Sequence, residues 1–128
     1  MALAAVFCGS GVVHLVRPQA FVSIMPRLIP GEHHTDLIYA TGVVELVCAA
    51  GLVGRTRWAA GASLATLAAV FPANVQMALD AGSGRNTGAG DSRAVAWGRL
   101  PLQVVMVWAA LQGRRPPGRP ADRAQAAR

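Results

Sequence analysis

The sequence predicts an all-α fold: a four-transmembrane-helix bundle with a short interfacial helix after the first span. Its length of 128 residues is the size of one domain, and 53% of the residues are hydrophobic. Only 14% are charged, against about 25% in a soluble domain. The apolar residues also gather into four runs that are separated by short polar connections. These observations together favour a membrane protein.

The first two apolar runs each carry one notable polar side chain. Residues 1–16 hold His14 and no charged residue, and residues 37–54 hold only the carboxylate of Glu45. The first run is short against the roughly 20 residues that cross a bilayer, which leaves open whether the chain begins upstream of Met1. A signal peptide is the competing interpretation, but no basic segment precedes the run and "RPQAF" is a poor cleavage site. We therefore expect a helix that stays in the membrane.

The other two runs complete the predicted bundle. Residues 58–79 are uncharged, and residues 96–112 carry only Arg99. Residues 1–112 thus form the predicted transmembrane domain. Between the first two runs, "QAFVSIMPRLIP" spaces four apolar residues at i, i+3, i+4 and i+7, which predicts a short helix in the outer interface: Phe21, Ile24, Met25 and Leu28.

The arginines indicate the orientation. All 12 basic residues are arginine. With four spans, the side that holds both termini and the 55–57 connection has seven arginines, and the opposite side has four outside the spans. The positive-inside rule then places both termini in the cytoplasm. The Pro- and Arg-rich tail, residues 113–128, is predicted to be disordered. Because the arginines flank apolar runs instead of gathering on one polar face, no nucleic-acid partner is expected.

Five polar residues inside the runs form the candidate site. At 1.5 Å per residue, His14 lies about 3 Å from the outer end of its helix, Arg99 about 5 Å and Asn74 about 8 Å. Glu45 and Gln103 lie about 11–12 Å from theirs. All five fall in the outer half of the membrane, and Glu45 is expected to pair with Arg99. The cluster is either structural, fixing the helix packing, or a polar pocket that binds a small lipophilic ligand or relays protons.

Other segments give weaker signals. Cys8 and Cys48 lack metal or redox spacing and are expected to be small buried residues, with a thiol pair as the alternative. The "GEHHTD" segment, residues 31–36, is interpreted as a solvated loop and not as a metal site. Residues 80–93 are Gly-rich and lack the phosphate-loop pattern, so a flexible loop is expected. No motif such as GxSxG or HExxH occurs, which argues against a self-sufficient enzyme.

Four short motifs, in order along residues 9–112, resemble those of the DoxX family of small four-helix membrane proteins. They are "GVVH" at 11–14 followed by Pro18, Phe21 and Pro26, "GVVE" at 42–45, "FPAN" at 71–74 with Met77, and "RLPLQ" at 99–103. The resemblance implies a multi-pass protein of the bacterial inner membrane. It also implies an accessory protein or subunit of a membrane redox or assembly system, with a redox complex or a second copy as partner. The alternatives are a quinone-interacting oxidoreductase component, with quinone as its cofactor, and a small transporter.

Overall fold

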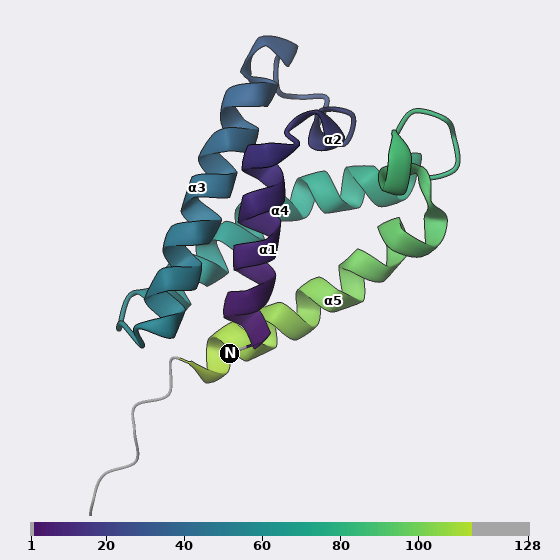
Figure 1. Cartoon of the computed structure of the whole chain (residues 1–128). Helices are drawn as coiled ribbons and strands as arrows, with labels where there is room; N and C mark the ends of the chain where they lie inside the picture. Colours follow the sequence, from purple (N-terminus) through teal and green to yellow (C-terminus); the bar gives the residue numbers. More distant parts are fainter. Residues whose placement is uncertain (1, 114–128) are drawn as a thin grey trace, which may run out of the picture.

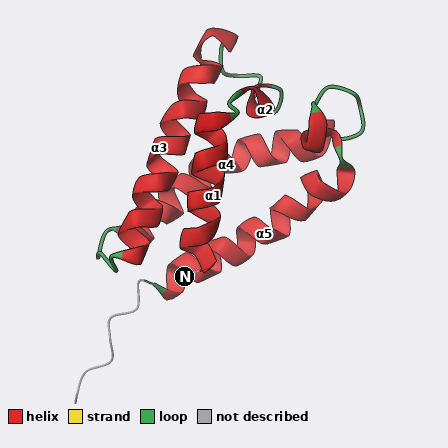
Figure 2. Ribbon diagram, viewed as in Figure 1, coloured by secondary structure: helices red, strands yellow, loops and turns green. Residues whose placement is uncertain are grey.

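The computed structural model describes residues 2–113, and over that range the chain is helical and contains no β-strand (Figures 1 and 2). The long α-helices are α1 (Ala2–Val16), α3 (His34–Val53), α4 (Ala59–Asp80) and α5 (Arg93–Gln112). The short elements are α2 (Gln19–Val22) and the 3₁₀ helices η1 (Gly31–His33) and η2 (Gly88–Asp91). The all-α prediction is therefore confirmed for the described residues. The predicted disordered tail, from residue 114 onward, lies outside them.

Each predicted apolar run coincides with most of one long helix. Three of these helices, α3, α4 and α5, are long and apolar enough to cross a membrane, and α1 is a shorter apolar helix of 15 residues. The helices extend past the apolar runs at their polar ends: α3 begins at His34 and α5 at Arg93. Hydropathy therefore locates the helices well, but it places the first residues of α3 and α5 a few residues too late in the chain.

The long helices pack as two pairs. α1 lies along α3, α4 lies along α5, and α3 also contacts α4 (Figure 1). The start of α1, the α3–α4 connection and the end of α5 lie toward one end of the molecule, and α2, η1 and η2 lie toward the other. The space between the two pairs is where the candidate site forms.

Two glycines allow α1 and α3 to approach closely. A Cβ atom built on Gly11 would lie 2.8 Å from the carbonyl oxygen of Gly42, and one built on Gly42 would lie 2.8 Å from the Cβ atom of His14. Small residues of this kind let helix backbones meet where lipid offers no hydrophobic drive for association. The contact brings together the polar residues three positions after each glycine, His14 and Glu45.

We expect Gly11→Ala to lower the free energy of unfolding by about 1 kcal/mol, because the added methyl group would overlap the backbone of α3. Thermal unfolding of the purified protein in mild detergent measures the change. Gly9→Ala is the matched control, since a Cβ atom at Gly9 meets nothing within 4 Å, and it should be neutral or slightly stabilising. Equal effects of the two substitutions would contradict this account of the helix contact.

The segment after α1 is helical as predicted, but only over four residues, and the expected apolar stripe is split. Ile24 is 5% exposed and packs with Met77 and Ala96, whereas Leu28 is 97% exposed. Pro26 interrupts the helix because a proline has no N–H to continue the hydrogen-bond ladder. The chain thus folds back over the end of the bundle instead of forming one continuous amphipathic helix.

Candidate functional site

A cavity of about 280 Å³ lies between the helix pairs. All four long helices and the α2 segment contribute to its wall. Most of the lining is apolar, including Phe7, Phe21, Met25 and Met106. Its polar lining residues are Ser10, His14, Thr41, Glu45, Asn74 and Arg99. Four of the five predicted site residues, His14, Glu45, Asn74 and Arg99, therefore share one cavity.

The Glu45 carboxylate is held by α1. Its Oε1 atom accepts a hydrogen bond of 3.1 Å from the Ser10 hydroxyl, and its Oε2 atom lies 3.0 Å from His14 Nδ1. Only 6% of the Glu45 surface is exposed. A carboxylate at this depth requires such partners because lipid offers it no hydrogen bonds.

The partners of His14 determine its tautomer when the ring is neutral. Nδ1 lies 2.9 Å from the carbonyl oxygen of Ser10. A carbonyl oxygen can only accept a hydrogen bond, so Nδ1 carries the proton and Nε2 is left as an acceptor. The ring also stacks on Phe21, with centroids 3.9 Å apart. Phe21 and Ser10 together fix the orientation of the imidazole.

The expected ion pair between Glu45 and Arg99 is wrong. Within residues 2–113, Arg99 has no ion pair or hydrogen bond through its side chain, and the partner of Glu45 is His14. The predicted depths of these residues assume that the outer ends of all helices lie at one level. Figure 1 instead shows α3 reaching beyond the end of α1. Because α3 packs along α1 with this offset, Glu45 lies beside His14, near the end of α1.

Asn74 and Gln103 join α4 to α5. The Asn74 amide Nδ2 donates to Gln103 Oε1 at 2.8 Å, and Gln103 Nε2 donates to the backbone oxygen of Leu67 at 2.5 Å. Leu67 lies on α4, five residues before Pro72. Gln103 is 3% exposed and does not line the main cavity. It instead positions Asn74, which does.

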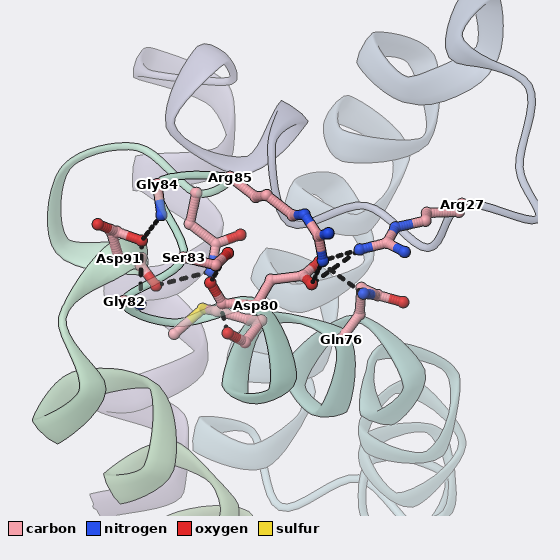
Figure 3. A network of polar contacts seen from close by, with 11 residues as sticks. Arg27, Gln76, Asp80, Gly82, Ser83, Gly84, Arg85 and Asp91 are labelled. Carbon is pink, nitrogen blue, oxygen red and sulfur yellow. Dashed lines mark hydrogen bonds and ion pairs between the residues drawn. The ribbon is translucent and has the colours of Figure 1, made fainter.

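A second polar cluster, centred on Asp80, was not predicted (Figure 3). The carboxylate accepts hydrogen bonds from Arg27 at 2.7 and 2.8 Å, from Arg85 at 3.1 Å and from Gln76 at 2.6 Å. The Asp80 backbone oxygen accepts a bond from Ser83. Asp80 is 6% exposed although it ends a membrane-length helix. The sequence does contain one signal of this cluster. Gln76 lies one helical turn before Asp80, the acidic residue that follows the uncharged run, so their side chains can meet on one face.

The Gly-rich connection between α4 and α5 has its own hydrogen bonds. Asp91 Oδ1 accepts bonds from the backbone N–H groups of Gly82 and Gly84, at 3.1 and 3.3 Å. The Asn86 side chain donates to the backbone oxygens of Met77 and Gly90. These contacts give the segment a defined path beside the Asp80 cluster.

The remaining candidates lie apart from the cavity. Cys48 is buried as expected, but Cys8 is exposed, and both thiols are free. His34 Nε2 lies 2.8 Å from the Ile29 carbonyl oxygen, and His33 lies 3.6 Å from Glu32. Over the described part of the chain, no three His, Cys, Asp or Glu side chains converge in a way that could hold a metal ion.

Comparison with known proteins gives a match to a protein family. The model of a family described as "Domain of unknown function (DUF8561)" matches residues 3–114. No curated protein and no solved structure matches the chain. The matched region contains the whole cavity and all four long helices except Ala2, the first residue of α1.

Proposed function

The chain belongs to the DUF8561 family, and we propose that it is an integral membrane protein that binds a small lipophilic ligand in the cavity between its helix pairs. The observation that carries this proposal is the composition of the cavity wall. It joins a mostly apolar surface to the polar groups of Ser10, His14, Glu45, Asn74 and Arg99. Such a combination is typical of sites that enclose an apolar body and orient one polar end.

The outer surface of the helices supports a membrane location. Large apolar side chains on α5 are well exposed, with Val104 at 68% and Trp108 at 61%. Contiguous apolar surface of this kind suits contact with lipid. In the proposal α1 crosses the membrane together with α3, α4 and α5. The arginine-rich side then faces the cytoplasm of a bacterial inner membrane, with both termini on it.

The proposed role is that of an accessory protein or subunit of a membrane redox or assembly system. The similarity of the four motifs to the DoxX family supports it, and the "GVVH" and "GVVE" motifs meet at the glycine contact that builds the polar end of the cavity.

A quinone-binding oxidoreductase component is the second candidate. The observation that favours it is the pair of aromatic rings, Phe7 and Phe21, that line the same cavity as the donors of Arg99. These groups suit a flat ring with carbonyl oxygens.

The test of the ligand site is to fill the cavity. Ala73 lines it, so we expect Ala73→Phe to reduce the lipophilic compounds that co-purify with the protein by at least about tenfold, a loss of about 1.4 kcal/mol in affinity. Mass spectrometry of solvent extracts provides the measurement. Ala69→Phe is the matched control, because Ala69 is an exposed residue one turn earlier on α4 that does not line the cavity. Identical extracts from both variants and the unaltered protein would rule out the cavity as the binding site.

A further inference from the structure

We infer that the ligand carries one anionic group at the end of an apolar tail, and that Arg99 binds this group. The inference rests on the proposed ligand-binding function and adds the chemical class of the ligand. It follows from comparing which polar groups of the cavity already have partners and which do not.

Arg99 is the cation of the cavity, and its hydrogen-bond donors are unused within the described residues, whereas the carboxylate Glu45 has only its Oε2 atom without a hydrogen bond. Its guanidinium group offers five N–H donors, and none of them bonds to a side chain or backbone atom within residues 2–113. The residue is partly buried in the wall of an apolar cavity. A cation without a bonded partner in a membrane interior is costly, so an anion in contact with Arg99 would be favoured over a neutral group.

The other charged group of the cavity does not serve as that anion. Glu45 accepts a hydrogen bond from Ser10 through Oε1, its Oε2 atom lies 3.0 Å from His14 Nδ1, and it makes no contact with Arg99 within 4 Å. The cavity therefore presents one carboxylate that α1 holds beside Ser10 and His14, and one guanidinium with no bonded partner within residues 2–113. This arrangement leaves the donors of Arg99 available to a ligand.

The uncharged polar groups of the wall are also engaged. The Thr41 hydroxyl donates to the Leu37 carbonyl oxygen, and the Asn74 amide donates to Gln103. The strongest remaining donor is therefore Arg99. A carboxylate or a phosphate matches the guanidinium with two parallel hydrogen bonds, which a neutral carbonyl cannot do.

The size and lining of the cavity suit one end of a slender molecule. A volume of about 280 Å³ is just below the range of about 300–1,000 Å³ for pockets that enclose drug-sized ligands. It has room for a charged group and the first part of one apolar chain. The apolar side chains beside Arg99, Val95, Leu102 and Met106, would contact that chain. An alkyl carboxylate and an alkyl phosphate share this chemistry.

Binding of matched eight-carbon probes tests the inference. Delipidated protein in a non-ionic detergent is titrated with octanoate, octyl phosphate, octanol and methyl octanoate, and affinity is followed by calorimetry. We expect one or both anions to bind at least about tenfold more tightly than the alcohol and the ester. The anion that binds more tightly identifies the ligand as a carboxylate or a phosphate.

Variants of Arg99 assign the preference to its charge. Arg99→Met should abolish the preference for anions, and Arg99→Lys should keep part of it because lysine retains the charge without the paired donors. Arg93→Gln is the matched control, since Arg93 is exposed on the same helix and outside the cavity. If Arg99→Met does not fold, the comparison of octanoate with its methyl ester on the unaltered protein still decides the question.

Failure of this inference differs from failure of the proposed function. If methyl octanoate or a short-tailed benzoquinone binds as tightly as both anions, and Ala73→Phe blocks that binding, the ligand is neutral and the anion inference is wrong. If no probe binds, or if Ala73→Phe leaves all binding unchanged, the cavity is not a ligand site and both proposals fail.

Discussion

Replacing Asp80 with alanine is expected to reduce the recovery of folded protein from membranes several-fold. One carboxylate holds together the end of α4, the segment after α2 through Arg27, and the α4–α5 connection through Arg85. All of these bonds are lost at once in the variant. Charge-assisted hydrogen bonds are among the stronger ones in proteins. Size-exclusion chromatography measures the recovery, and limited proteolysis reports whether the α4–α5 connection is released.

Two further substitutions make this prediction specific. Asp80→Asn keeps one acceptor but loses the two-oxygen contact with Arg27, so its effect should be intermediate. The two arginine side chains are more than 60% exposed, so added salt should screen their attraction to Asp80. High salt should therefore reduce the difference in recovery of folded protein between Asp80→Asn and the unaltered protein. Glu32→Gln is the control, because that carboxylate is 78% exposed. Normal recovery and unchanged proteolysis of Asp80→Ala would show that the cluster is not needed for folding.

Gln103→Leu is expected to lower the free energy of unfolding by about 2–3 kcal/mol. The variant loses two buried hydrogen bonds and leaves the Asn74 amide without its acceptor, and an unsatisfied buried polar group costs about 1–3 kcal/mol. Asn74→Leu should be destabilising for the same reason. Equilibrium unfolding in lipid nanodiscs or mixed micelles gives the values for each variant.

The double variant Asn74→Leu/Gln103→Leu should cost less than the two single variants added together. The difference is the coupling energy of the pair, and such energies for hydrogen bonds between membrane helices average about 0.6 kcal/mol and reach about 1.7 kcal/mol. Gln76 supplies the control, because it lies on α4 near Asn74 but bonds to Asp80. Asn74→Leu and Gln76→Leu should therefore be additive. A zero coupling energy between Asn74 and Gln103 would contradict the contact.

The helices and most of the polar site could be predicted from the sequence, because both depend on strong local rules. Apolar runs of membrane length form helices whatever their neighbours are. Ionisable and amide groups within such runs turn toward one another because lipid cannot satisfy them. His14, Glu45, Asn74 and Arg99 share a cavity for this reason, although they come from four different helices.

The pairing of these groups could not be predicted by the same rules. Depth along a helix does not state how far one helix extends past another, and the choice of His14 over Arg99 as the partner of Glu45 depends on that offset. The glycines at positions 11 and 42 held the missing information, since each precedes a polar residue by three positions. The Asp80 cluster was missed because Arg27 and Arg85 lie in connections, where spacing along the chain does not indicate contact.

The pairing of α1 with α3 and of α4 with α5 also bears on how the chain enters the bilayer. Ribosomes deliver helices in order, and Glu45 follows the residues that hold it, Ser10 and His14, by about one helical hairpin. The carboxylate therefore emerges when its partners are already made. Asn74 finds its acceptor in the helix that comes directly after it. Glu45 and Asn74 can thus each find a partner within their own half of the protein during insertion, before the two halves meet and enclose the cavity.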